Sequence, residues 1–370
     1  MIGAMGNRGT ALIAALSIIM ILLPLGAYVV LQCRTDLLIE RNFRAEVEAF
    51  YAAEAGLEHA IAEIDPGQSF DAVLAGPDRI AGTADDGAFP FRHGPPSDFA
   101  SPQLSYDVRA TPVAGNMLSL VSRGTGRYGA TKVVTALVAR SPIVFTPAAL
   151  YVQGDIRRLD LGGGLLLSGL DHRIDDPPAS PMGTAAPTAA LASPDAEAEQ
   201  DLRRRLPEDV AARLPGAGGA PSIATSPTFN VQGYADRFAA QSSSVHLSAL
   251  GETATLGTPG TPQISVVDGD AYISGWLHGN GVLVVRGTLD VMGTFEFTGL
   301  VVALNGILFE PASNITINGT LWQGPAMDDR LQLRGSGAIG YSSSALTAVD
   351  TAFPGILPHA AVVNGWEEQL

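Results

Sequence analysis

Two groups of acidic side chains have types and spacings that could do chemistry. Asp78, Asp85 and Asp86 lie among glycines in a loop-rich stretch, where their carboxylates could ligate Ca²⁺. Their spacing lacks the terminal Glu and the alternating Asp or Asn positions of an EF-hand loop. Asp-Gly turns on a protein surface are the commoner explanation, so calcium stays an alternative. Asp290 and Glu296 are six residues apart in a strand-rich region, and converging carboxylates are what a glycan-cleaving enzyme needs.

Other catalytic patterns are missing from the sequence. Outward polar positions that keep strands soluble are the commoner explanation of Asp290 and Glu296. The six histidines are scattered without the HExxH spacing of a zinc site. Three glycines at 162–164 are followed by no Lys-Ser/Thr pair, so they do not form a phosphate loop. We therefore expect no enzyme and no cofactor.

Composition narrows the class of protein further. The chain has 370 residues, a formal net charge of −15 and a pI near 4.7, which disfavours nucleic-acid binding through a general basic surface. Its length allows two or three domains. The single cysteine, Cys33, cannot form an intramolecular disulfide. Abundant glycine, with 42 residues, suits a β-rich protein with many tight turns.

Residues 10–31 contain no charged side chain, so they are the segment that could anchor the rest of the chain. At 1.5 Å per residue such a helix is about 33 Å long, enough to cross the hydrocarbon core of a bilayer. A cleaved secretory signal has a shorter apolar run and a small-residue cleavage site, and neither is present here. We predict a retained membrane helix. Arg8 and Arg34 flank it, so positive charge does not fix its orientation.

The helical pattern continues through residues 32–64 and becomes amphipathic. Charged and apolar residues alternate, and the large apolar residues recur at helical spacing. These are Phe43, Val47, Phe50, Leu57, Ile61 and Ile64, with Ala53 or Glu54 filling the gap in the series. The pattern of residues 32–64 predicts that one face of this part of the helix packs against a partner or a head domain.

Both ends of this helix resemble a known family. The start, RGTALI from Arg8, resembles a prepilin junction, in which a short polar leader ends in Gly before an apolar helix. Further on, AFYAAEAGLE closely resembles the A-F-Y-x-A-E-A-G-L-E signature of PilX-type minor pilins of type IV pili, and Asn42 before it also fits the family pattern. The resemblance covers about the first 65 residues. The family positions are Asn42, Ala49, Phe50, Tyr51, Ala53, Glu54, Ala55, Gly56 and Leu57.

The resemblance implies processing and assembly. Prepilin peptidase would cut after Gly9 and leave Thr10 as an N-methylated terminus. Major pilins place a Glu at the fifth mature position, which is Ala14 here, and this departure favours a tip or initiating position over the shaft. Pro24 predicts a kink in the span, of a kind found in many pilins and also tolerated in ordinary membrane helices.

Residues 65–141 predict a pilin-like β head that follows a loop-rich link. Three alternating runs at 104–110, 117–123 and 132–139 are joined by short Gly-containing turns, which predicts an antiparallel meander. Residues 142–264 are expected to be an irregular β and Pro-Ala-rich region, with short strands at 144–145, 149–152 and 165–167 and one charged helix at 197–214. The arginines at 203–205 are expected on its solvated face.

Residues 265–345 show a short repeat. Glycines fall at 269, 275, 281, 287, 293 and 299, and short β-branched or aromatic strands lie between them. Such a period favours a parallel β-solenoid over an antiparallel meander with glycine turns. Residues 346–370 are expected to be a C-terminal tail. The predicted fold class is α+β, with a long membrane-spanning helix, a small antiparallel head and a mainly-β C-terminal domain.

The functional expectation combines these elements. As the resemblance implies, the chain is a minor pilin that acts in assembly or priming, and as a tip or surface-contact subunit. Its expected partners are other pilins, the assembly machinery, prepilin peptidase, the bacterial inner membrane and an unidentified surface ligand. The alternative is a membrane-anchored periplasmic or surface adhesin that never joins a pilus. A weaker third possibility is a glycan-active solenoid enzyme.

Overall fold

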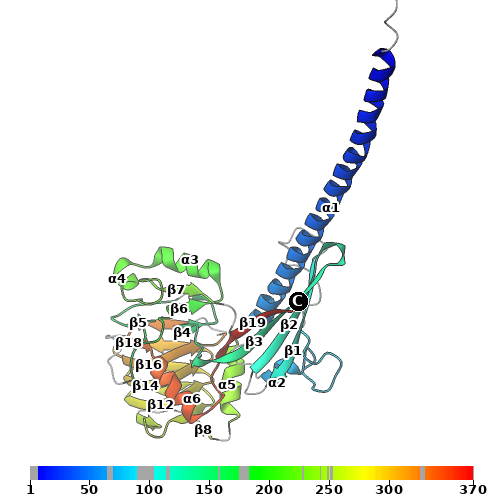
Figure 1. Cartoon of the computed structure of the whole chain (residues 1–370). Helices are drawn as coiled ribbons and strands as arrows, with labels where there is room; N and C mark the ends of the chain where they lie inside the picture. Colours follow the sequence, from blue (N-terminus) through cyan, green and yellow to red (C-terminus); the bar gives the residue numbers. More distant parts are fainter. Residues whose placement is uncertain are drawn as a thin grey trace, which may run out of the picture. The chain divides into compact units, whose positions relative to one another are not determined.

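The computed structural model divides the chain into two compact units. It describes residues 7–64, 70–89, 104–113, 117–156, 159–174, 183–226, 229–241, 243–247, 250, 253–325 and 330–369. The helix–sheet unit comprises Met1–Arg140 and Ala361–Leu370, and the solenoid unit comprises Ser141–Ala360. Figure 1 labels many of the elements of both units.

The helix–sheet unit contains one very long helix and a four-stranded sheet. Helix α1 spans Asn7–Glu63 and is followed by the short helix α2, Phe70–Leu74. The sheet order is β1 (Ser105–Val113), β2 (Met117–Thr125), β3 (Thr131–Val144) and β19 (His359–Gln369), and a single 3-10 turn, η1 (Arg127–Gly129), joins β2 to β3. β1 pairs with β2 and β2 with β3, both antiparallel, so the predicted meander is confirmed.

The fourth strand reveals how the units are connected. The chain leaves the sheet at the end of β3 and returns through β19 after forming the solenoid unit, which is therefore an insertion into the sheet. Near the start of β3, Lys132 Nζ lies 2.9 Å from Glu368 Oε1 at the end of β19. Near the end of β3, Ser141 O lies 2.8 Å from His359 Nδ1 at the start of β19. β3 and β19 therefore run in opposite directions. The expected tail at 346–370 instead contains helix α6 (Ser343–Ala352) and β19.

The solenoid unit is built from two parallel sheets. The larger sheet stacks β10 (Gln263–Val267), β12 (Trp276–Val285), β14 (Thr294–Ala303), β16 (Asn314–Gln323) and β18 (Ser336–Tyr341) in parallel register. The smaller sheet stacks β11 (Ala271–Ile273), β13 (Thr288–Val291), β15 (Gly306–Phe309) and β17 (Arg330–Leu333), also in parallel. The preference for a solenoid over a meander is confirmed.

Glycines stand at the corners of successive coils. Gly281 pairs with Gly299 and Gly299 with Gly319, so the coils between them are 18 and 20 residues long. The six-residue glycine period thus marks thirds of an 18-residue coil. At this corner φ is +121° for Gly281, +125° for Gly299 and +147° for Gly319, a region that L side chains rarely adopt. Each long strand turns there, and its two halves lie on different faces of the coil.

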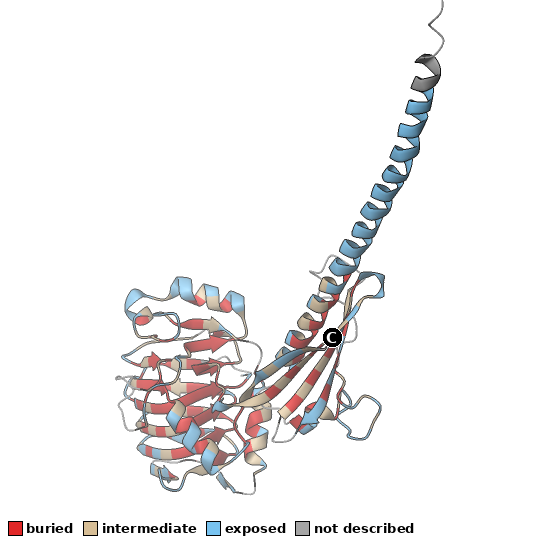
Figure 2. Cartoon of the chain, in the orientation of Figure 1, coloured by how far each residue is buried: buried red, intermediate tan, exposed pale blue. Residues whose placement is uncertain are grey.

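Apolar side chains fill the coil on the inside and also cover part of its outside. Phe295, Ile315 and Leu321 belong to the interior core. On the outside of the second half of each long strand, a second core includes Leu300 and Trp322. Helices α5 (Val231–Ala239) and α6 cover this outer layer, which explains why these strand halves are buried on both faces. Figure 2 shows the continuous burial of these strands.

Strands from residues 142–264 extend the same sheet, and two of them coincide with the short strands expected at 149–152 and 165–167. They are β4 (Ala148–Val152), β5 (Leu166–Ser168), β6 (Ala189–Ser193), β7 (Ile223–Thr225), β8 (Ser244–Leu247) and β9 (Thr253–Leu256). The predicted helix at 197–214 is two helices, α3 (Ala196–Arg205) and α4 (Glu208–Ala211), separated at Leu206 and Pro207. Proline at this position disfavours a helical conformation in the residue before it.

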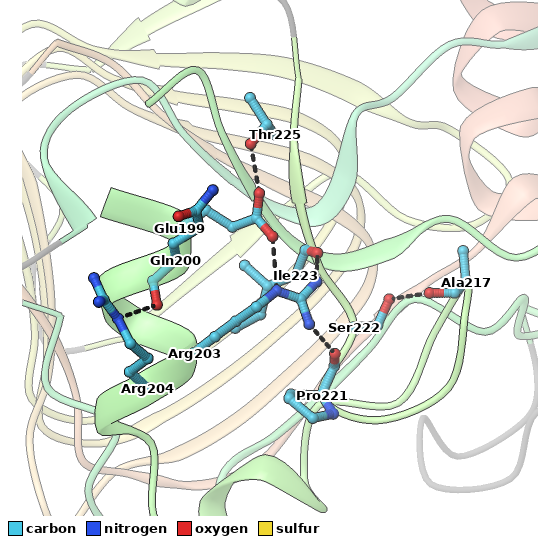
Figure 3. A network of polar contacts seen from close by, with 9 residues as sticks. All are labelled: Glu199, Gln200, Arg203, Arg204, Ala217, Pro221, Ser222, Ile223 and Thr225. Atoms are coloured by element: carbon cyan, nitrogen blue, oxygen red, sulfur yellow. Dashed lines mark hydrogen bonds and ion pairs between the residues drawn. The ribbon is translucent and has the colours of Figure 1, made fainter. Parts of the chain in front are cut away.

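Helix α3 is fastened to β7, which lies at the edge of the larger sheet. Arg203 donates hydrogen bonds to the carbonyl oxygens of Pro221 and Ile223, and its Nε lies 2.7 Å from Glu199 Oε1 (Figure 3). Thr225 donates to the other oxygen of Glu199. Arg203 therefore binds the edge of the sheet, whereas the sequence placed it on a solvated helix face. Such contacts protect an edge strand from pairing with other chains.

Candidate functional site: the long helix

Helix α1 has an exposed N-terminal part and a packed C-terminal part. Every residue from Leu12 to Arg44 is exposed, and burial begins at Ala45 (Figure 2). The exposed part contains a stretch long and apolar enough to cross a membrane, and none of its most apolar window is buried in this unit. A surface of this kind is stable only when lipid or other apolar helices surround it.

Small residues form the packed face of α1. Ala45, Ala49, Ala53, Gly56 and Ala60 recur at helical spacing and are all buried. The amphipathic pattern of the sequence assigned this face to larger residues. Leu57 and Ile64 do lie in it, but Phe43 is 67% exposed. The helix packs on β1 and β2 through alanine and glycine because the two backbones approach closely.

Gly124 on β2 and Gly126, which directly follows the end of that strand, permit this approach. A Cβ atom at Gly124 would lie 2.0 Å from Ala49 O and 2.4 Å from Ala53 N, and one at Gly126 would lie 2.4 Å from Ala45 O. Residues two apart on a strand share one face, so both glycines face the helix. The AFYAAEAGLE segment thus supplies small residues where the helix touches the sheet.

The remaining family positions lie on the sides of the helix. Asn42 is exposed, and Glu54 and Ala55 are half-buried. Tyr51 is 56% exposed. The ring centroid of half-buried Phe50 lies 5.7 Å from that of Tyr51 and 5.9 Å from that of Trp366 on β19. Since Trp366 is itself 50% exposed, these three rings form an aromatic surface between α1 and the edge strand.

The turn between β2 and β3 contacts α1 near the beginning of the packed face. Tyr128 in this turn has φ of +59°, unusual for a residue with a large side chain. Its ring lies under the Arg41 guanidinium, with 3.3 Å between Arg41 Cζ and the ring centroid. Arg127 Nε lies 3.4 Å from Glu48 Oε2. A cation–π contact and an ion pair thus hold the turn against the helix.

The proposed leader lies only partly within the described residues. Residues 1–6 are outside them, and α1 already includes Gly9 and Thr10.

The candidate calcium loop uses its carboxylates internally. Gly82 N donates to Asp86 Oδ2 at 2.9 Å, Ile80 N donates to Asp78 Oδ1 at 2.8 Å, and Asp85 Oδ2 accepts from Asp78 N at 3.2 Å. A hydrogen bond from the Thr83 hydroxyl is the main cause that lowers the pKa of Asp85. Among the described residues, no group of three or more His, Cys, Asp or Glu side chains is arranged to hold a metal ion. These hydrogen bonds connect all three carboxylates to backbone groups of the loop itself.

The two carboxylates considered for catalysis lie in different sheets. Asp290 is on β13, and burial together with the neighbouring Glu310 charge raises its pKa. Glu296 is on β14, where its Oε2 lies 2.8 Å from His278 Nδ1. The six-residue spacing therefore places Asp290 and Glu296 on different faces of the coil, and each has a different neighbour.

One pair with catalytic spacing was not anticipated from the sequence. Ser168 Oγ lies 2.9 Å from His172 Nε2, the distance of a nucleophile and its base. Both residues are only 1% exposed, so a substrate has no access to them in this structure. The neighbouring Asp171 accepts from Ser343 N at 2.8 Å and Ser343 Oγ at 3.0 Å, which joins this segment to the start of α6. The arrangement is a buried polar connection within the solenoid unit.

Sequence reasoning missed the sheet side of the α1 interface. Gly124 and Gly126 looked like turn residues, although β2 continues to Thr125. Their spacing of two, which places both on one face of a strand, was the available signal. Trp366 and Tyr128 had no local signal, because their contacts come from distant parts of the chain.

No protein-family model matches the chain, and no curated protein matches it. Among solved structures, the chain is similar to the competence-associated pilin ComZ from Thermus thermophilus, with 13% sequence identity and a TM-score of 0.24. The alignment covers 88% of this chain and 98% of that chain.

Proposed function

We propose that this chain is a minor pilin of a type IV pilus-like system that acts by association and not by catalysis. The observation that carries the proposal is the division of α1. Its uncharged residues 12–31 are exposed, while its AFYAAEAGLE segment packs on an antiparallel sheet through small residues. This combination suits a subunit that is held in a membrane and later surrounded by the helices of other subunits.

The proposed cycle begins in the bacterial inner membrane. Residues 10–31 hold the precursor there, and prepilin peptidase removes the leader after Gly9. During assembly, neighbouring helices replace lipid around the apolar part of α1, and the buried alanine and glycine face keeps the sheet attached to the helix. The mechanism needs no bound cofactor.

We further propose a tip or priming position. Ala14 occupies the place of the glutamate that major pilins carry, and a unit of 220 residues, Ser141–Ala360, is inserted into the sheet. An insertion of this size supports a subunit used in few copies over one that repeats along a slender shaft. Quantitative mass spectrometry of sheared fibres tests this position, and a copy number close to that of the major subunit would contradict it.

Processing is the experiment that tests the main proposal. Intact-mass and N-terminal analysis would be applied to the full chain from native membranes and from sheared surface fibres. The expected result is an N-methylated Thr10 terminus that is present in the fibre fraction. An intact Met1 terminus confined to membranes would instead support the alternative, a membrane-anchored adhesin outside any pilus.

A further inference from the structure

The first halves of the long solenoid strands form an exposed polar face on the outside of the coil. In these strand halves, alternate side chains such as Leu277, Phe295 and Ile315 belong to the interior core. The side chains between them therefore point outward. In register from β9 to β18, the first outward row consists of Thr253, Trp276, Thr294, Asn314 and Ser336. All five are exposed or half-buried.

A second outward row lies two residues further along the same strands. It consists of Thr255, His278, Glu296 and Thr316. His278 Nδ1 lies 2.8 Å from Glu296 Oε2, and the His278 ring contacts Trp276, with 4.8 Å between the ring centroids. These contacts from β14 to β12 support the Trp276 indole, which is 43% exposed. We call the two rows together the polar face.

The polar face carries little charge, although the chain has a net charge of −15. Glu296 is the single acidic side chain of the two rows, and His278 is its partner. Neither row contains Lys or Arg, the side chains that bind phosphate or carboxylate groups most strongly. The charge of the face therefore fits a neutral ligand that is held by hydrogen bonds.

Strand formation does not explain the asparagines on this side of the coil. Threonine favours β-strands, whereas asparagine is depleted in them. Asn314 belongs to the first row, and Asn280 and Asn318 belong to a third row beside the glycine corner, where each is only 8% exposed. Within the described part of the chain, Asn318 Oδ1 is buried and has no hydrogen-bond partner. Such an acceptor costs stability unless a ligand or water donates to it.

The rows place hydrogen-bonding groups on a regular flat grid. Neighbouring strands lie about 4.8 Å apart, and residues two apart on one strand lie about 7 Å apart. Threonine hydroxyl and asparagine amide groups both donate and accept hydrogen bonds, as sugar hydroxyls do. The exposed indole of Trp276 adds a flat apolar surface on which the C–H face of a pyranose ring stacks. Because the grid is flat, a ligand must contact several strands at once, as an extended chain of sugar rings does.

We propose that the polar face binds a neutral β-1,4-linked polysaccharide that lies along the solenoid axis. Successive rings of such a chain follow a nearly straight line, like the rows of the face. One ring stacks on Trp276, and the hydroxyl groups of the chain bond to the side chains of both rows. This inference goes beyond the proposed pilin function, because it concerns the solenoid unit and requires neither processing nor assembly.

Binding is tested with the full chain in a detergent that has no sugar headgroup. Of the three tryptophans, Trp322 is buried, so a Trp366→Phe chain has Trp276 as its exposed tryptophan. Iodide quenching of its emission is measured with cellohexaose or chitohexaose, two neutral β-1,4-linked hexasaccharides. We expect at least one of them to protect Trp276 at sub-millimolar concentration, equally well in molar salt. Glucose at the same concentration of rings should not protect it.

Matched substitutions assign binding to the polar face. Calorimetric titration with the protecting hexasaccharide should show an affinity about tenfold or more lower for Trp276→Ala, because it removes the aromatic contact. Asn314→Ala should lower the affinity about threefold to tenfold through lost hydrogen bonds. Tyr272→Ala removes a ring that is 48% exposed on the smaller sheet, and Asn305→Ala removes an exposed amide between β14 and β15. Both controls should keep the original affinity.

Four results would overturn the inference. They are an absence of protection by either hexasaccharide, equal protection by glucose, loss of protection in molar salt, and equal losses of affinity in the face and control variants. Circular dichroism of each variant verifies that the solenoid is folded. The pilin proposal fails separately, because its test reads the N-terminus and the fibre fraction, and neither affects binding of a hexasaccharide by the purified chain.

Discussion

Both units depend on glycines that let two backbones approach, but they use them differently. In the helix–sheet unit, Gly124 and Gly126 admit α1 to one face of β2, a single contact between two elements. In the solenoid unit, Gly281, Gly299 and Gly319 stack on one another at a corner, so the same contact is repeated from coil to coil. The difference predicts a local defect in the first unit and a propagating defect in the second.

Gly299→Ala should have the largest effect. Its Cβ would lie 2.1 Å from Gly281 O, and φ of +125° already disfavours alanine. Steric overlap and backbone strain act together, so we expect a loss of about 4 kcal/mol or more in the stability of the solenoid unit. Hydrogen exchange of the full chain in detergent should show faster exchange throughout β12, β14 and β16.

Gly260→Ala is the matched control for this substitution. A Cβ at Gly260 meets nothing within 4 Å, so exchange in the same strands should stay unchanged. If Gly299→Ala altered only the amides beside residue 299, the coils would be independent and the contrast between the units would fail.

Gly124→Ala should have the next largest effect, confined to the helix–sheet unit. The new methyl group would overlap the α1 backbone at Ala49 and Ala53, and neither backbone can move without separating helix from sheet. We expect a loss of about 2–4 kcal/mol, seen as faster exchange in residues 45–64 and in β2. Gly365→Ala, whose Cβ would make an ordinary 3.8 Å contact with Leu137 Cβ, should leave this interface intact. Equal effects of the two substitutions would contradict the close-approach explanation.

Alkaline pH distinguishes the units through their buried tyrosines. Burial and the negative charge of Asp171 raise the pKa of Tyr341 to about 12, whereas a tyrosine in an unfolded chain ionises near pH 10. The folded solenoid unit therefore holds this proton more tightly. The stabilisation is complete below pH 10 and disappears as the pH rises through 12, and it amounts to about 3 kcal/mol.

Tyr341→Phe isolates this contribution. The variant should flatten the loss of solenoid stability between pH 10 and pH 12, measured by urea unfolding at each pH. Burial also raises the pKa of Tyr106 in the helix–sheet unit, so that unit should keep its own alkaline response in the variant. An unchanged pH profile of the solenoid unit would show that Tyr341 does not contribute.

Arg203→Gln should have the smallest effect. It removes the guanidinium that binds the carbonyl groups of Pro221 and Ile223, at a cost of about 1–2 kcal/mol, because hydrogen bonds to a charged group are lost. Exchange should rise only around β7, with increased light scattering as the edge becomes available for pairing. Arg204→Gln removes a side chain that is 75% exposed and should change neither measurement.

The sequence predicted that a solenoid is present, but it did not predict how many strands belong to it. Glycines at 281, 287, 293 and 299 report the corners of the coil directly, because each corner recurs at a fixed interval. Strands such as β4 and β6 carry no such period, and they join the sheet by pairing with β16 and with each other. Their membership depends on pairing partners far away in the sequence, which a local pattern does not contain.

In the candidate site, too, some features follow from local sequence and others only from contacts between distant residues. The uncharged residues 10–31 and the AFYAAEAGLE segment determined by themselves that the chain has a long helix with an apolar first half and a second half suited to packing, because both signals are local. Only the tertiary structure decided that Ala49 and Ala53 face Gly124, and that Arg41 lies over Tyr128. It also decided that β19 returns to complete the sheet around an insertion. These contacts join residues more than 70 positions apart, and their energy depends on backbone distances that exist only once the helix and sheet have packed.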